Sequence, residues 1–201
     1  MTDKNYTARQ FDPWRTAPVD EVSRKNLVSA YYFDVDTLGL KQPGFEQYER
    51  TVIHHFGDTL ATLAFTLDHQ IALFEQYRVP LRRWTLEIPA GRARKGEVSH
   101  DGAIRELREE SGLIAQDISV LLRFANSPGF STQQTTIFLA KNCIYAPEQR
   151  DPQGPEEKRS TVRFVTLSDA YDMVLGGQIV DAKSIIAILT AHERRDFIFT
   201  D

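Results

Sequence analysis

"LEIPAGRARKGEVSHDGAIRELREESGL", from Leu86 to Leu113, concentrates carboxylates and arginines between glycines. Like charges that are three or four residues apart on a helix repel by about a few tenths of a kcal/mol per pair, so stability alone would favour scattering them. We therefore expect a positively charged partner among the four glutamates of this stretch, which are Glu97, Glu106, Glu109 and Glu110.

A helix is predicted from about Asp101 to Ser111. Its apolar positions form a narrow stripe at helical spacing, Ser99 or Asp101 is available to cap its start, and Gly112 suits the left-handed position that ends a helix. On this helix Glu106, Glu109 and Glu110 occupy positions i, i+3 and i+4, which share one face. Arg105 stands one turn before Glu109 and can pair with it.

Carboxylates one turn apart are suitable ligands for a hard divalent cation such as Mg²⁺, which takes oxygen ligands and completes its shell with water or substrate phosphates. The alternative is a solvated helix face, which is the usual interpretation of an isolated "RELREE". The wider spacing favours the metal site. From Gly91 to Leu113 the sequence matches, without a gap, the signature GX5EX7REUXEEXGU, in which U is an aliphatic residue.

This signature is the Nudix box, so the sequence resembles a Nudix hydrolase. The resemblance implies an α/β class fold, a Nudix-type α/β/α sandwich with a mixed central sheet, to which this chain adds an N-terminal β-rich arm. We divide the chain into a loose N-terminal arm (1–25), N-terminal β-strands (26–60) and the Nudix hydrolase domain (61–201). Two C-terminal helices are predicted near Ser168–Leu175 and Asp181–Arg194.

Composition limits the alternatives. The 201 residues have a formal net charge of −4, without the basic excess of a protein that binds a nucleic-acid backbone. No stretch approaches the roughly 18 apolar residues of a membrane span. The single cysteine, Cys143, cannot form an intramolecular disulfide. These features predict a cytoplasmic protein that binds neither nucleic acid nor a membrane.

Three features outside the box resemble ADP-ribose pyrophosphatases. They are "FEQYRVPLRRWTLEIPAG" (74–91), Pro128 in "SPGFS", and "GGQIVDAKSIIAILTA" (176–191). The resemblance implies hydrolysis of the pyrophosphate bond of ADP-ribose to AMP and ribose 5-phosphate. It also implies a homodimer whose N-terminal strands cross to the other subunit, so that residues near Phe33 to Arg50 serve the partner's site.

The same resemblance assigns roles within the box. Glu106 and Glu110 would be the principal ligands of Mg²⁺ or Mn²⁺, Glu109 an additional ligand, and the carbonyl of Ala90 a further one. Arg105 and Glu97 would orient the metal-binding carboxylates, with Gly91 and Gly112 as structural support. Together with Glu156, we count Glu109 and Arg105 as the candidate catalytic residues.

The general base that deprotonates the attacking water should be a carboxylate on the loop "DPQGPEEKRS" (151–160). Alignment back from "TVRFVTLSDA" places Glu156 where several ADP-ribose pyrophosphatases have this base, with Glu157 beside it. Lys158 and Gln133–Gln134 stand where relatives often have acids. These departures leave the base and the exact substrate open.

Substrate binding is predicted for Arg78, Arg50, Glu87 and Pro128. Arg78 matches an arginine that contacts the diphosphate in this subfamily, and a guanidinium suits phosphate oxygens. A salt bridge at the rim and a plain surface strand position are the alternatives for Arg78 and Glu87, respectively. Trp84 alternates with Leu86 and Ile88 and is interpreted as core, with stacking on adenine as the alternative.

Other functions stay open at this point. The same fold could hydrolyse another nucleoside diphosphate sugar or a dinucleoside polyphosphate. A Nudix domain without catalysis could sense a nucleotide, although an intact box argues against loss of the metal. RNA decapping would require basic and aromatic surfaces along an RNA path, and the acidic charge balance disfavours it.

Overall fold

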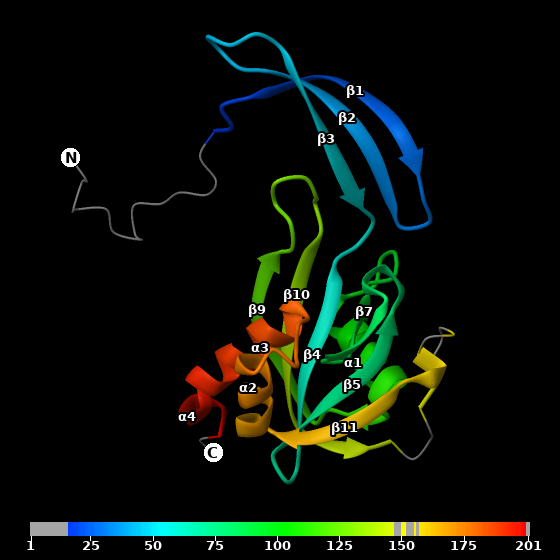
Figure 1. Cartoon of the computed structure of the whole chain (residues 1–201), viewed down its shortest axis with the longest axis vertical. Helices are drawn as coiled ribbons and strands as arrows, with labels where there is room; N and C mark the ends of the chain where they lie inside the picture. Colours follow the sequence, from blue (N-terminus) through cyan, green and yellow to red (C-terminus); the bar gives the residue numbers. More distant parts are fainter. Residues whose placement is uncertain (1–15, 147–149, 152–154, 156, 200–201) are drawn as a thin grey trace, which may run out of the picture. The chain divides into compact units, whose positions relative to one another are not determined.

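The computed structural model describes residues 16–146, 150–151, 155 and 157–199. The chain divides into two compact units, the first ending at His54 and the second beginning at His55. Figure 1 shows the elements of both units. Among the described residues, no helix has the length and apolar character needed to cross a membrane.

The first unit contains a three-stranded sheet in the order β1-β2-β3. The strands are β1 (Asp20–Ser29), β2 (Phe33–Lys41) and β3 (Tyr48–His55). β1 begins inside the segment that the sequence suggested as a loose arm, and it pairs antiparallel with β2. All residues of β1 are exposed, and among the described residues of this unit only Leu38 is a buried hydrophobic side chain.

The second unit contains an eight-stranded sheet in which β11, β5, β4, β10 and β8 follow one another. β6, β7 and β9 pair with β5, β4 and β10, respectively. The pairing of β10 with β4 is parallel, whereas the other pairings are antiparallel, so the sheet is mixed as predicted. The strands are β4 (Thr59–Thr66), β5 (Gln70–Arg78), β6 (Arg83–Glu87), β7 (Ala90–Arg92), β8 (Leu113–Ile114), β9 (Asp117–Ala125), β10 (Gln134–Tyr145) and β11 (Thr161–Thr166).

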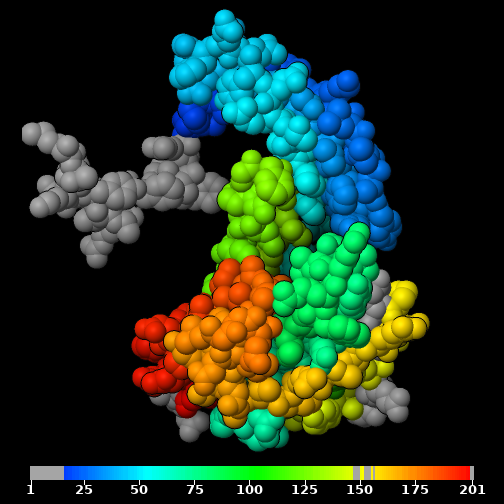
Figure 2. Space-filling view, in the orientation of Figure 1, coloured from blue at the N-terminus to red at the C-terminus, as the bar shows by residue number. Residues whose placement is uncertain are grey.

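Helices cover both faces of this sheet, which is the predicted α/β/α arrangement. β4 and β5 are buried along most of their length because each of their faces packs against helices. The C-terminal helices contribute Ala170 and Ala187 to one core cluster, and they form the orange and red surface in Figure 2. The helices are α1 (Ser99–Ser111), α2 (Leu167–Leu175), α3 (Ala182–Glu193) and α4 (Arg195–Ile198).

The opposite face of the sheet packs against α1. Leu107 joins Ala64 and Ala72 of the central strands in a second cluster, and Ala103 joins Leu60 in a third. These apolar contacts fix one side of α1 to the sheet, and the glutamates extend from a neighbouring arc of the same helix.

Candidate active site

Strand β7 approaches α1 so closely that a side chain does not fit at Gly91. A Cβ atom added there would lie 1.9 Å from the carboxyl carbon of Glu106. At the other end of the helix, Gly112 has φ 73° and its N–H donates to the carbonyl of Arg108 at 2.9 Å. Glycine is therefore required at the two positions for different reasons. At Gly91 the side chain of Glu106 leaves no room for a Cβ atom, and at Gly112 the helix ends in a left-handed conformation.

Arg105 is the cation among the glutamates. Its Nε donates to Glu97 Oε1 at 2.8 Å, and its Nη1 donates to Glu106 Oε1 at 2.7 Å and to Glu109 Oε2 at 3.2 Å. The hydrogen bond from Arg105 is the largest influence on Glu97 and lowers the pKa of that carboxyl to about 2. The guanidinium thus links three carboxylates and fixes their spacing.

Glu110 is buried, with 4% of the residue exposed. The N–H of Ala90 donates to its Oε2 at 2.7 Å, which joins the start of β7 to the last turn of α1. Burial raises the pKa of Glu110 to about 8, an effect that the bond from Ala90 opposes and the charges of Glu106 and Glu157 reinforce. Burial also raises the pKa of Glu106.

These residues fit a divalent cation by their chemistry. Two neighbouring carboxyls whose pKa values are raised are groups that a divalent cation would help to ionise. Among the described residues, no group of three or more His, Cys, Asp or Glu side chains is arranged as a complete metal cage. Mg²⁺ does not require such a cage, because it keeps several waters and takes one or two carboxylates together with substrate phosphates.

A second charged cluster surrounds Glu87 at the end of β6. Arg78 donates through Nε to Glu87 Oε1 at 2.7 Å and through Nη2 to Oε2 at 2.5 Å. Lys183, from the first turn of α3, bonds to Oε2, and the hydroxyl of Thr85 donates to Oε1 at 2.7 Å. Burial by itself would raise the pKa of Glu87, but Arg78 and Lys183 outweigh it and lower the pKa to about 2.

The two clusters are electrostatic neighbours. The charge of Glu110 helps to raise the pKa of Arg78, and the charge of Lys183 acts on Glu110. The short segment from Glu87 to Ala90 connects them along the chain, because Glu87 binds Arg78 and Ala90 binds Glu110. The acidic cluster and the ion pairs of Arg78 and Lys183 with Glu87 are therefore neighbours.

The structure places the remaining predicted residues as follows. Arg50 lies on β3 in the first unit, where its Nη1 donates to the carbonyl of Glu49 at 2.9 Å. Pro128 lies in the connection between β9 and β10. Glu156 lies outside the described residues. Glu157 is described, and its charge helps to raise the pKa values of Glu106 and Glu110.

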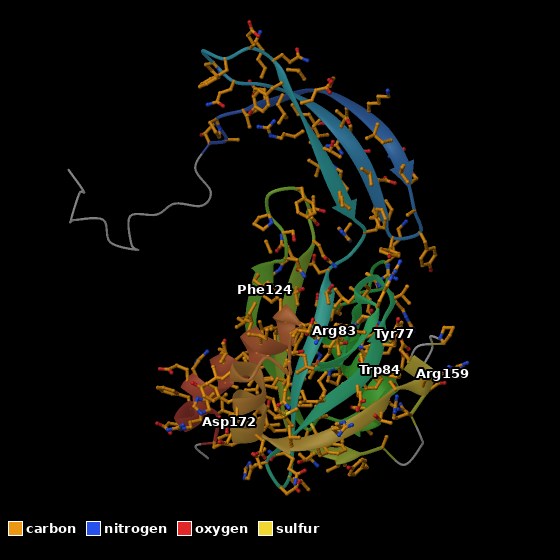
Figure 3. All side chains as sticks on the ribbon, viewed as in Figure 1. Tyr77, Arg83, Trp84, Phe124, Arg159 and Asp172 are labelled. Carbon is orange, nitrogen blue, oxygen red and sulfur yellow. The ribbon has the colours of Figure 1, made fainter. Side chains whose placement is uncertain are left out.

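The interpretation of Trp84 as a core residue was wrong. Trp84 is 50% exposed, and its ring meets the edge of Tyr77 with centroids 5.9 Å apart. Both residues come from the β5–β6 hairpin (Figure 3). Tyr77 is 37% exposed as well, so this end of the hairpin presents two exposed aromatic side chains.

Lys183 is the residue of the site that the sequence did not reveal. Its side chain is 11% exposed, and its ammonium group also lies 2.9 Å from Asp181 Oδ1. The sequence "DAKS" predicted a helix start at Asp181, but nothing in it indicated a contact with Glu87, which is 96 residues away.

Replacement of Gly91 by alanine should weaken metal binding with little loss of fold. The added Cβ must displace the carboxylate of Glu106, and disturbance of the groups that orient metal ligands costs about tenfold or more in metal affinity. We expect a corresponding rise in the Mg²⁺ concentration that gives half-maximal activity. Gly129→Ala is the matched control, because no atom lies within 4 Å of its added Cβ; equal Mg²⁺ dependence of the two variants would contradict the prediction.

The mixed sheet between helices, with an acidic loop-helix-loop against it, defines a hydrolase of the Nudix class. The NUDIX domain model matches residues 57–187, so the chain belongs to the Nudix family and is a Nudix hydrolase. The predicted family and fold class are thereby confirmed.

Several curated relatives have the name ADP-ribose pyrophosphatase, and two of them match most of this chain at more than 30% identity. The one from Bacillus subtilis (strain 168) is 33% identical over 167 residues, which cover 83% of this chain and 89% of the relative. The one from Mycobacterium tuberculosis (strain ATCC 25618 / H37Rv) is 32% identical over 176 residues, covering 86% and 83%. The chain is also similar to the methanol dehydrogenase activator of Bacillus methanolicus, at 29% identity over 174 residues, covering 87% and 90%.

A solved structure supports the fold. The structure titled "Crystal structure of ADP compounds hydrolase" superimposes with a TM-score of 0.78 and covers 90% of this chain and 96% of its own. At 17% sequence identity this likeness bears on the fold alone.

Proposed function

We propose that this Nudix hydrolase cleaves the pyrophosphate bond of ADP-ribose, with Mg²⁺, to give AMP and ribose 5-phosphate. One observation supports the proposal above the others, namely that the short segment from Glu87 to Ala90 binds Arg78 at one end and the buried Glu110 at the other. A diphosphate ester requires both, a metal site for its phosphoryl oxygens and a cation for its remaining charge. Relatives that are named ADP-ribose pyrophosphatase favour this substrate.

The residues that would hold Mg²⁺ are Glu106, Glu110 and the carbonyl of Ala90, with Glu109 as an additional ligand. When bound, the ion neutralises the diphosphate, polarises phosphorus and lowers the pKa of water. Mn²⁺ has similar ligand preferences and is the alternative ion. Arg105 would fix the carboxylates through its bonds to Glu97, Glu106 and Glu109.

The reaction itself is a displacement at phosphorus. Arg78 would hold the diphosphate, because its Nη1 has no hydrogen-bond partner among the described residues and its side chain is 40% exposed. Water attacks one phosphorus, its proton passes to a loop carboxylate, and the bond from that phosphorus to the bridging oxygen breaks. The bridging oxygen leaves with the other phosphate.

Glu156 remains our proposal for the base, and Glu157 is the alternative because its charge reaches Glu106 and Glu110. We expect Glu156→Gln to lower kcat about a hundredfold or more, since a general base contributes that much, and Glu157→Gln to lower it far less. Initial rates at saturating ADP-ribose and Mg²⁺ compare the two variants directly. The reverse ranking would assign the base to Glu157 instead.

The substrate is tested by initial rates with Mg²⁺ on ADP-ribose, GDP-mannose, UDP-glucose and diadenosine polyphosphates. The proposal expects ADP-ribose to have the highest kcat/KM and AMP to be a product. A preference for another member of the panel would replace the substrate and leave the hydrolase class intact. Binding of ADP-ribose without turnover of any compound would favour a nucleotide sensor.

A homodimer and a cytoplasmic location complete the proposal. The three-stranded sheet of the first unit buries little apolar side chain of its own, while Val22, Leu27 and Val28 are half exposed. Such a sheet needs a covered apolar face for stability, which a second copy would supply. The buried, unpaired Cys143 suits a reducing compartment. Light scattering during size-exclusion chromatography should give twice the 23.0 kDa of one chain.

A further inference from the structure

Outside the acidic cluster, the described residues contain a series of four linked charges, Arg78, Glu87, Lys183 and Asp181, of which Glu87 and Lys183 are the least exposed. It alternates in sign and runs from β5 through β6 to the first turn of α3. Glu87 is 3% exposed and Lys183 is 11% exposed at the side chain. Buried charges are costly unless they are paired and hydrogen-bonded, so an arrangement of this kind calls for a function.

The ion pair with Glu87 would by itself weaken the attraction of Arg78 for a diphosphate. An arginine that is bidentate to a carboxylate forms a neutral pair, and a neutral pair attracts a diphosphate weakly. The second cation, Lys183, bonds to the same carboxylate oxygen, Oε2, that receives Nη2 of Arg78. It thereby neutralises Glu87 from the other side and leaves the charge of Arg78 available.

Asp181 is the last residue in this series of linked charges. Its Oδ1 lies 2.9 Å from the ammonium of Lys183, and its Oδ2 accepts hydrogen bonds from the N–H and the hydroxyl of Ser184, at 3.0 Å and 2.5 Å. Asp181 is the N-cap of α3, where the helix dipole stabilises negative charge. The negative charge of Asp181, at one end of this series of linked charges, is therefore compensated by the dipole of α3. The positive charge at the other end of the series is that of Arg78.

The backbone around Glu87 is held by the same turn of α3. The hydroxyl of Ser184 accepts a hydrogen bond from the N–H of Ile88 at 2.8 Å. Glu87 is thus fixed by its side chain through Lys183 and by its neighbouring peptide through Ser184. Only Arg78, at the exposed end, has a free nitrogen among the described contacts.

We infer that Lys183 is a positioning residue for the diphosphate, which holds the Glu87 carboxylate so that Arg78 remains oriented and positively charged. This inference rests on the proposed function, because Arg78 is taken as the group that contacts the substrate. Lys183 itself acts through Glu87 and Arg78. Through Lys183, α3 influences substrate binding.

Lys183→Met, which keeps the length and removes the charge, should raise KM for ADP-ribose about tenfold, as expected for loss of a supporting hydrogen-bond partner, with kcat changed far less. Lys183→Arg, which keeps the charge, should restore most of the affinity. Lys141→Met is the matched control, because Lys141 lies 3.8 Å from Asp117 on the surface; its KM should equal that of the wild type. A KM for Lys183→Met equal to that of the control would overturn the inference.

A double-mutant cycle separates positioning from a general loss of structure. If Lys183 acts through Arg78, Lys183→Met should add little to the KM of Arg78→Gln. Fully additive effects on KM would contradict the inference. So would a fall in kcat at constant KM, which indicates a loss of active fold.

A measurement without substrate keeps this inference separate from the proposed function. The Nε–H signal of Arg78, assigned by its loss in Arg78→Gln, should exchange slowly with solvent in the wild type and faster in Lys183→Met. If the wild type hydrolyses no nucleoside diphosphate, the proposed function fails, and this exchange rate still tests the positioning. Unchanged exchange in Lys183→Met would overturn the inference even in an active enzyme.

Discussion

Glu110→Gln should lower kcat with ADP-ribose about a thousandfold at pH 7, the scale of loss expected when a group that stabilises the reacting charge is removed. Glu110 is the most buried of the box glutamates and lies against the N–H of Ala90. The amide oxygen of glutamine can still accept that hydrogen bond, so the fold should be kept while the anionic ligand is lost.

Initial rates over a range of Mg²⁺ concentrations, together with the midpoint temperature of thermal unfolding, check this expectation. Glu193→Gln, on the exposed end of α3, is the control and should behave as the wild type in both. A Glu110→Gln variant that hydrolyses ADP-ribose at the wild-type rate would exclude Glu110 from the metal site. If Glu110→Gln is inactive and also shows no unfolding transition, its loss of activity reflects a loss of fold. Glu109→Gln is then the variant whose rate is compared with that of the wild type.

Glu87→Gln should lower the free energy of unfolding at pH 7 by about 2–3 kcal/mol, because removing one partner leaves buried charge uncompensated. This loss is smaller than the roughly 3–5 kcal/mol expected when a fully buried pair is broken, because Arg78 is 40% exposed and water screens part of its interaction. Glu75→Gln gives the matched comparison, since Glu75 pairs with Arg163 on the surface, where an ion pair contributes about 0–1 kcal/mol.

The effect of Glu87 should depend on pH in one direction. Its pKa in the folded protein is about 2, below its ordinary value of 4.5. The native state therefore binds fewer protons than the unfolded state between these values, and stability rises with pH there. The contribution of Glu87 is fully present above pH 4.5 and is lost as the pH falls towards 2.

Urea unfolding of the wild type and of Glu87→Gln at pH 7 and at successively lower pH measures this difference. The two proteins should approach the same stability as Glu87 becomes protonated in the wild type. A difference that stays constant down to pH 3 would mean that the Glu87 carboxylate is not the source of the effect.

The acidic helix was predictable because its contacts are local. The periodicity of an α-helix places Glu106, Glu109 and Glu110 on one face, and Gly112 takes the left-handed conformation that its position suggested. The start of the helix was less accurate. Its N-cap is Val98, without a side-chain hydrogen bond, because Glu97 holds the preceding turn by accepting from the N–H of Arg94 at 2.8 Å.

The parts of the site that depend on distant contacts could not be predicted in the same way. An alternating pattern such as that of Trp84, Leu86 and Ile88 shows which residues share a face, but it does not show where the covering helices end. Ile88 is buried, whereas Trp84 lies beyond the cover. The contact of Lys183 with Glu87 depends on the docking of α3 against β6, which no local pattern in the sequence specifies.

The bond between Glu87 and Lys183 joins residues 96 positions apart, whereas Gly91, Glu97, Arg105, Glu106 and Glu110 all lie between β6 and β8. During synthesis from the N-terminus, the acidic helix is complete well before the ribosome reaches Lys183. A nascent chain that ends before α3 contains every carboxylate of the box, but Glu87 is without its second cation. If Lys183 positions Arg78 as we infer, full affinity for a diphosphate is acquired late, when the last long helix has been made and has docked.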